Sequence, residues 1–305
     1  MSEISERRLF IIHNPVAGSK HPERLRRRVE AVLAKRQVEF EYAYTESRGH
    51  AADLARDALE SGYDRIVAAG GDGTVLEVVS ALVDSDAALA LLPVGTGNQL
   101  AANMRLPKGV ARSIEVALNG GFRKIDVGML DGQPFTCIAG AGFDADVVRP
   151  DSSLKRRVGY LAYVHAAAAA AFSPKPSDLR IVVDGEETAC RGIGVEVANM
   201  PGLTAPFLPR PVDLVPDGKP DDGLLDVCVL AVETTIDFVS AITSIMTGRL
   251  ARDPRLQYFR GREITVDADP PLTVQIDGER LGSTTPFVAT VKPGALNLLV
   301  PAADG

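Results

Sequence analysis

The chain has 305 residues, a hydrophobic fraction of 46% and no tryptophan, a composition typical of a folded globular protein with room for two domains. Its formal net charge of −7 argues against a nucleic-acid partner held by bulk electrostatics. Cys137, Cys190 and Cys228 lack the spacing of metal ligands, so we expect reduced thiols and a cytoplasmic protein.

The first half of the chain alternates predicted strands with predicted helices. Short apolar runs predict strands at residues 9–13, 38–45, 65–69 and 87–92. Helical spacing of apolar residues predicts helices at 22–36, 50–60, 75–83 and from residue 98. This alternation predicts βαβ units and a mostly parallel sheet, in which ligands bind at the carboxyl ends of the strands.

After about residue 121 the pattern changes to antiparallel β-structure. Asp131-Gly132, Asp184-Gly185 and Asp277-Gly278 each separate two apolar runs, and Asp-Gly is a strong hairpin signal. The flanking strands are expected at 124–130, 133–139, 179–183, 187–197, 272–276 and from 280 onward. Helices are expected at 155–172 and 236–246. We therefore predict a first domain over residues 1–123 and a second over 124–305, whose last strand returns to the first domain.

The segment from Arg65 to Thr74 ends a strand in three glycines that bracket Asp72. Gly70, Gly71 and Gly73 can expose main-chain N–H groups without Cβ obstruction, and a turn of this kind before a helix favours an anion. Asp72 would repel a bare phosphate, which indicates a phosphate that arrives with Mg²⁺. Thr74 and Glu77 have the spacing of a capping box.

Two further loops follow predicted strands, namely Asn14-Pro15-Val16-Ala17-Gly18 and Pro93-Val94-Gly95-Thr96-Gly97-Asn98. Either one alone could be an ordinary turn. Neither the Walker nor the Rossmann spacing of glycines is present. All three loops in one βαβ domain predict a different kind of nucleotide phosphate site.

These motifs resemble the diacylglycerol kinase catalytic-domain family, which includes bacterial lipid kinases and sphingosine kinases. The shared signatures are N-P-x-x-G, G-G-D-G-T-x-x-E and P-x-G-T-x-N, in the order found here. The resemblance extends over nearly the whole chain, through residues 142–145, 222–227, 275–279 and 293–301. It implies an α/β nucleotide domain followed by an antiparallel β-sandwich, with the active site between them.

The resemblance also implies roles for individual residues. Glu279 would be the base that deprotonates a lipid hydroxyl, and Asp72 would be needed for catalysis with ATP and Mg²⁺. A magnesium site is implied at Lys219, Asp222 and Leu224. The implied nucleotide contacts are Asn14, Thr45, Gly70, Gly71, Asp72, Gly73, Thr74, Gly95, Thr96 and Asn98.

Several alternatives stay open at this point. Asp184-Gly185-Glu186 repeats the tripeptide around Glu279, so only the resemblance distinguishes the two glutamates. Leu76 and Gln99 stand where many family members carry Asn and Asp, and residues 199–210 replace a glycine triplet. An NAD kinase-like enzyme and a non-catalytic nucleotide- or lipid-binding protein are the rival interpretations. The acceptor could be diacylglycerol, phosphatidylglycerol, a sphingoid base or an isoprenoid alcohol.

A lipid acceptor implies contact with a membrane surface. Residues 1–8 are polar, unlike a signal peptide, and the longest apolar stretch, 160–172, is too short to span a bilayer. We therefore expect a peripheral protein at the inner face of the membrane. Basic residues at 155–157 and five arginines between 249 and 262 are candidate contacts. An exposed sheet edge could pair with a second copy, which leaves a homodimer open.

Overall fold

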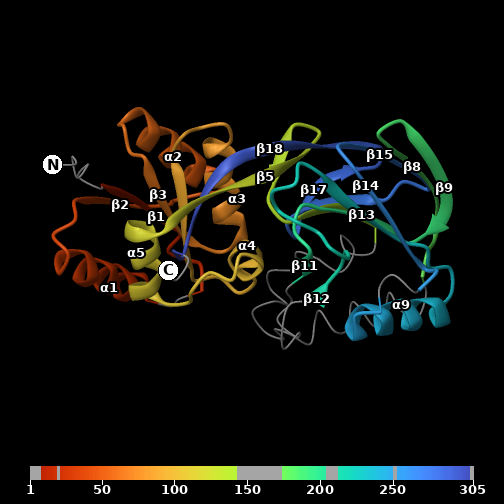
Figure 1. The fold of residues 1–305 in the computed structure, drawn as a ribbon, viewed down its shortest axis with the longest axis horizontal. Helices are drawn as coiled ribbons and strands as arrows, with labels where there is room; N and C mark the ends of the chain where they lie inside the picture. The colour runs from red at the N-terminus through yellow and green to blue at the C-terminus, as the bar shows by residue number, and fades with distance from the viewer. Residues whose placement is uncertain (1–7, 19–20, 143–173, 204–211, 250–252, 303–305) are drawn as a thin grey trace. The chain divides into compact units, whose positions relative to one another are not determined.

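The computed structural model describes residues 8–18, 21–142, 174–203, 212–249 and 253–302. The chain forms two compact units, of which the first is Met1–Val127 with Gly294–Gly305 and the second is Gly128–Pro293. The chain passes from the first to the second within strand β5 (Gly121–Leu130) and returns within β18 (Phe287–Val300) (Figure 1).

The first unit is built on a parallel sheet in the order β2-β1-β3-β4, with the C-terminal part of β18 beside β4. The strands are β1 (Leu9–His13), β2 (Phe40–Tyr44), β3 (Arg65–Gly70) and β4 (Ala88–Pro93). Every residue of β1 and β3 is buried, as expected for strands covered by helices on both faces. The predicted parallel α/β unit is confirmed.

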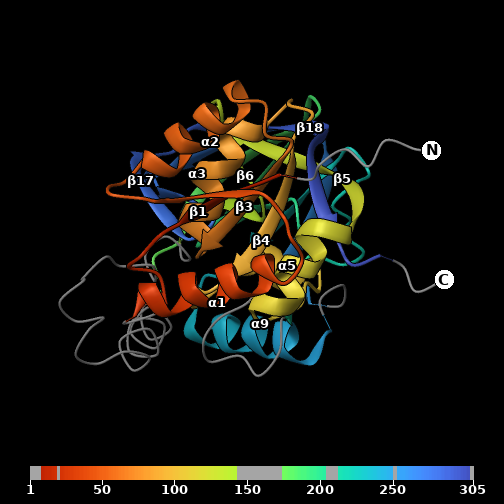
Figure 2. The ribbon, with the colours of Figure 1, turned by 90° about the vertical axis from the view of Figure 1, so that its left-hand side faces the viewer.

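Helices cover both faces of this sheet (Figure 2). One face is covered by α1 (Pro22–Ala34) and α5 (Val110–Asn119), and the other by α2 (His50–Glu60) and α3 (Asp72–Leu82). Helix α4 is short (Gln99–Asn103). Leu25, Val29 and Leu33 of α1 pack with Ile114 of α5 over the sheet. Because α1 and α3 follow neighbouring strands but lie on opposite faces, the carboxyl ends of β1 and β3 form a topological switch point, where open α/β sheets bind ligands.

The second unit is an antiparallel β-sandwich, as the resemblance implied. One sheet has six strands in the order β14-β13-β10-β7-β16-β17, and the other includes β8, β9, β15 and part of β18. The remaining elements are β6 (Gln133–Phe135), β7 (Ile138–Gly142), β8 (Ser177–Val183), β9 (Glu186–Gly192), β10 (Gly194–Ala198), β11 (Gly202–Leu203), β12 (Val212–Asp213), β13 (Leu225–Leu230), α9 (Thr235–Thr247), β14 (Leu256–Gly261), β15 (Glu263–Asp269), β16 (Thr273–Ile276) and β17 (Glu279–Thr284).

All three predicted Asp-Gly hairpins are present. They join β5 to β6, β8 to β9 and β16 to β17. In each turn both residues have positive φ, for example 46° at Asp277 and 83° at Gly278, as a two-residue type I′ turn requires. Glycine meets this requirement without strain, and aspartate tolerates it better than most residues.

Two predicted strands were too long. Residues 133–139 form β6 and β7, which belong to different sheets, and residues 187–197 form β9 and β10, which also do. The chain crosses between the sheets at Thr136–Cys137 and again at Ile193. No Asp-Gly or other strong turn signal marks either crossing in the sequence. The helix predicted at 236–246 is confirmed as α9, whereas the one at 155–172 lies outside the described residues.

Candidate active site

The loops after β1 and β3 are joined at the switch point. Asn14 donates from Nδ2 to Thr74 Oγ1 at 3.0 Å, and its Oδ1 accepts from the N–H of Val16 at 3.1 Å. The main-chain N–H of Asn14 donates to the carbonyl of Ala69 at 3.0 Å. Two predicted nucleotide contacts from different loops are therefore held together by their side chains.

Glycines allow the main chains of the three loops to lie in direct contact with one another. Gly18 has a φ of +64°, and a Cβ there would lie 1.5 Å from the carbonyl oxygen of Val94. A Cβ on Gly95 would lie 2.4 Å from the Cα of Gly71. Substitution at either glycine would push the loops apart, so the glycines that predicted a phosphate site also permit its assembly.

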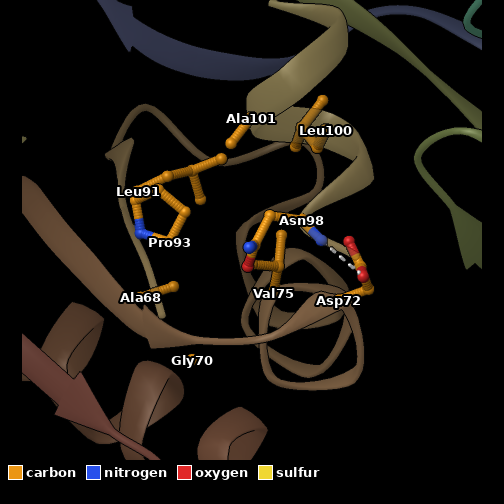
Figure 3. A pocket seen from close by; sticks show the side chains of 9 residues that line it. All are labelled: Ala68, Gly70, Asp72, Val75, Leu91, Pro93, Asn98, Leu100 and Ala101. Carbon is orange, nitrogen blue, oxygen red and sulfur yellow. Dashed lines mark hydrogen bonds between the residues drawn. The ribbon is translucent and has the colours of Figure 1, made fainter. Parts of the chain in front are cut away.

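Asp72 organises the third loop. Its Oδ2 accepts from the N–H of Asn98 at 2.8 Å (Figure 3). Its Oδ1 accepts from the N–H of Gln99 at 2.6 Å, at the start of α4. Asn98 has a left-handed φ of 51° and bonds back to Gly95 through its side-chain amide. A Cβ on Gly97 would lie 2.5 Å from Asp72 Oδ2. The carboxylate that sequence motifs associate with phosphate and metal therefore also holds two main-chain amides.

The predicted capping box of Thr74 and Glu77 is wrong. Helix α3 begins earlier, at Asp72, with Gly71 as an extended N-cap and no side-chain cap. The Thr74 hydroxyl accepts from Asn14 instead. Glu77 accepts from the main-chain N–H groups of Gly49 at 2.8 Å and Ala51 at 3.1 Å, at the start of α2. Neither Thr74 nor Glu77 therefore caps the start of α3, and the N-terminus of a helix favours an anion.

Residues of the second and third loops line a small cavity of about 10 Å³, together with apolar side chains such as Val75, Leu91 and Leu100 (Figure 3). This volume corresponds at most to one water molecule. This cavity is therefore too small for a nucleotide. The predicted contact Thr96 is exposed, whereas Gly73 is half-buried in the first turn of α3.

The end of β2 is hydrogen-bonded to the end of β1, next to the buried ring of His13. Thr45, a predicted nucleotide contact, donates its main-chain N–H to the carbonyl of His13 at 2.9 Å. His13 is fully buried, and its Nδ1 lies 2.6 Å from the hydroxyl of Tyr42. Burial lowers the pKa of His13 to about 4, so the ring is neutral at pH 7. His13 therefore lies in the sheet under the candidate site as an uncharged ring, and its carbonyl holds the main chain of Thr45.

In the second unit, the predicted base Glu279 is half-buried and begins β17, directly after the Asp277-Gly278 turn. The Asp277 carboxylate accepts from the hydroxyl and N–H of Thr136 at 2.8 Å, and from the N–H groups of Cys137 at 2.8 Å and Ile138 at 2.9 Å. Burial raises the pKa of Asp277, and these hydrogen bonds oppose that rise. They fix the turn where the chain crosses from one sheet to the other.

The predicted magnesium loop contains an ion-pair network. Asp222 accepts from the N–H of Leu224 at 3.2 Å through Oδ1, and its Oδ2 lies 3.5 Å from the Arg260 guanidinium. Arg260 also bonds to Asp226 at 2.7 Å and to the carbonyl of Asp217 at 3.1 Å. A carboxylate with main-chain carbonyls is a donor set that suits Mg²⁺.

The described residues hold no group of three or more His, Cys, Asp or Glu placed for a metal, and Arg260 already neutralises Asp222. Sequence analysis counted Arg260 among the candidate membrane contacts and missed its ion pair with Asp226, which lies 34 residues away in the chain.

The arginine segment is less positive than its composition suggests. Arg255 pairs with Asp237 at 2.7 Å and Asp253 at 3.2 Å, and Arg260 is engaged as described above. Arg249 and Arg262 are exposed. Arg252 and the basic run at 155–157 lie outside the described residues. In the part of the chain that the structure describes, no helix is long and apolar enough to span a bilayer.

Comparison with known proteins identifies the family. Residues 8–130 match the model of the diacylglycerol kinase catalytic domain, and residues 137–300 match the YegS C-terminal NAD kinase beta sandwich-like domain. A diacylglycerol kinase of Bacillus subtilis is 30% identical over 284 residues, which cover 90% of each chain. The chain belongs to the diacylglycerol kinase catalytic-domain family.

Other members agree in sequence and fold. A diacylglycerol kinase of Staphylococcus saprophyticus is 29% identical to this family member over 90% of its chain and 89% of the relative. The crystal structure of a diacylglycerol kinase from Bacillus anthracis has a TM-score of 0.78 at 22% identity and covers 97% of both chains. The resemblance on which the site assignments rest is thus confirmed, whereas the roles of the individual residues stay predictions.

Proposed function

We propose that this protein is an ATP-dependent lipid kinase that transfers the γ-phosphate to the hydroxyl of a diacylglycerol-like acceptor. The observation that carries the proposal is the convergence of three glycine-bearing loops at the switch point, cross-linked by Asn14–Thr74 and Asp72–Asn98. Family membership supports a kinase.

The nucleotide would bind through main-chain groups. The N-terminus of α3 follows Gly70 and Gly71 and has no side-chain cap, and the helix dipole favours negative charge there. Thr45, Thr96 and the Asn98 loop would complete the contacts with ATP. Mg²⁺ bound with the nucleotide would neutralise charge on the transferred phosphoryl group, and Asp72 would lie beside that charge.

Glu279 would act as the general base. As the acceptor oxygen bonds to the γ-phosphorus and the bond from that phosphorus to the β–γ bridging oxygen breaks, Glu279 takes the hydroxyl proton and ADP leaves. Lys219, Asp222 and Leu224 would offer a second Mg²⁺ site, in competition with Arg260 for Asp222.

One rival has its own support, because the matched C-terminal domain is described as NAD kinase beta sandwich-like. The first-unit match to the diacylglycerol kinase catalytic domain favours the lipid kinase. The test is incubation with γ-labelled ATP and Mg²⁺, with diacylglycerol, phosphatidylglycerol, a sphingoid base, an isoprenoid alcohol or NAD in separate arms. We expect label in a lipid; label in NAD alone, or in nothing, would reject the proposal.

We also propose peripheral contact with the membrane, since the acceptor resides in a bilayer. Arg249 is exposed at the end of α9, and Ile236 and Val239 of that helix expose 78% and 56% of their surface. Co-sedimentation with anionic and neutral vesicles at low and high salt tests this contact. Binding should require anionic lipid and weaken with salt; no sedimentation under any condition would remove it.

A further inference from the structure

Gln275 connects the turn before Glu279 to a buried carboxylate. Its Oε1 accepts from the N–H of Gly278 at 2.8 Å, and its Nε2 donates to Glu196 Oε2 at 3.3 Å. Gln275 and Glu196 expose only 1% and 3% of their surface. A buried amide that is bonded at both ends is costly to displace, because any movement leaves polar groups unsatisfied. The side chain therefore restrains Gly278, the residue next to the predicted base.

A glycine makes this long reach feasible. In the six-stranded sheet Gly140 of β7 lies opposite Glu196 of β10 on one side and opposite Gln275 of β16 on the other. Neighbouring strands are about 4.8 Å apart, so the two side chains must meet across the strand between them. A Cβ on Gly140 would lie 2.2 Å from Glu196 Oε2. Because Gly140 has no side chain, the Glu196 carboxylate can occupy the space above it.

The twin hairpin lacks this connection. Asp184, like Asp277, accepts main-chain N–H groups of a neighbouring segment, here those of Arg262 and Glu263 at 2.9 Å. The residue two before that aspartate is Val182, where the other hairpin has Gln275. Valine has no polar side-chain atom, so it cannot accept from Gly185. The Gln275 contact is a specific addition to the turn that precedes Glu279.

We propose that Gln275 and Glu196 are positioning residues for Glu279, which hold the Gly278 main chain so that the Glu279 carboxylate is presented to the acceptor hydroxyl. The proposal rests on the proposed function, in which Glu279 is the base. Asp277 fixes the first residue of the turn and Gln275 fixes the second. The Asp277 carboxylate is bonded to Ile138 of β7, and Gln275 reaches across β7 to Glu196 of β10. These contacts connect the turn to the centre of the sheet, although β17 is an edge strand.

The test is the substitution Gln275→Leu, which keeps most of the volume and removes both hydrogen bonds. Misplacement of a catalytic group by about 1 Å can cost roughly 100-fold in rate. We expect kcat for lipid phosphorylation to fall about 10- to 100-fold, with an unchanged KM for ATP. Val182→Leu is the matched control in the twin hairpin and should change neither constant. Glu196→Gln keeps an acceptor oxygen for Gln275, so it should retain more activity than Glu196→Leu.

A readout specific to positioning comes from combined variants. If Gln275 acts through Glu279, Gln275→Leu should cost nothing further in a Glu279→Gln background. A multiplicative loss would overturn the proposal. Full kcat in Gln275→Leu together with an inactive Glu279→Gln would also overturn the positioning role of Gln275. That result would be compatible with the proposed function. Activity in Glu279→Gln would instead reject the base assignment. If Gln275→Leu does not fold, Gln275→Asn, whose shorter amide cannot span both partners, should show the same loss of kcat.

Discussion

Asp72 and Asn98 are joined by a hydrogen bond between the carboxylate of one and the main-chain N–H of the other, at 2.8 Å. The second carboxylate oxygen holds Gln99 in the same way. Five residues further along α3, Glu77 does the same for the start of α2. Both acidic residues of the glycine-rich motif thus accept main-chain N–H groups of other segments and help to hold those segments in place.

The first prediction concerns Asp72. Asp72→Ala should lower kcat at least ~10²-fold, the scale of losing one electrostatic stabiliser. It should also destabilise the fold by about 2 kcal/mol, because two main-chain N–H groups lose an ionised acceptor. Thermal unfolding and steady-state kinetics measure both effects. Glu77→Gln is the control: it should cost stability and leave kcat near that of the wild type. Wild-type turnover in Asp72→Ala would refute the assignment.

The second prediction separates the two Asp-Gly-Glu hairpins. General-base removal typically costs about 10²–10⁴-fold, so Glu279→Gln should be nearly inactive and still bind ATP. Glu186→Gln, which alters the twin hairpin, should have normal kinetics. Both variants are isosteric, and ATP binding can be followed by calorimetry. Equal effects from the two substitutions would show that the role carried over from the family does not apply to Glu279.

Local patterns predicted the fold well and the contacts between distant residues poorly. The helix His50–Glu60, the strand Leu9–His13 and the Asp-Gly turns depend on spacing and turn chemistry within a few residues. The partners of Asp72 and Glu77 lie 26 and 28 residues away, and no local pattern identifies them. The same reason explains why the capping box was wrong.

The second unit shows this limit most clearly. The crossing at Thr136–Cys137 is held by Asp277, which lies 140 residues after Cys137 in the chain, so no local pattern identifies it. Arg260 was considered only as part of a basic cluster. Its role beside Asp222 and Asp226 arises because β13 and β14 are paired in the folded sheet.

The third prediction concerns Arg260 and magnesium. Arg260→Met leaves the buried Asp226 without its ion-pair partner, which should destabilise the protein by about 2 kcal/mol, since Arg260 is itself partly exposed. The variant also removes the competitor for Asp222, so millimolar Mg²⁺ should raise its Tm more than that of the wild type. Arg260→Met combined with Asp222→Asn is the control and should lose the extra rise. A Tm that ignores Mg²⁺ in every variant would eliminate a metal at Asp222.

The fourth prediction follows from the buried imidazole of His13. Burial lowers its folded-state pKa from 6.5 to about 4, with a smaller opposing effect from Glu23. Between these values the unfolded chain binds a proton that the folded protein does not, so stability should rise with pH through this window and be complete above about 6.5. As the pH falls from 6.5 to 4, this group alone should cost on the order of 3 kcal/mol. His13→Phe removes the titration and should flatten that part of the curve, measured by urea unfolding across the window. Tyr44→Phe keeps the imidazole and its contact with Tyr42, so its pH dependence should match that of the wild type. The same slope in wild type and His13→Phe would assign the pH dependence to other groups.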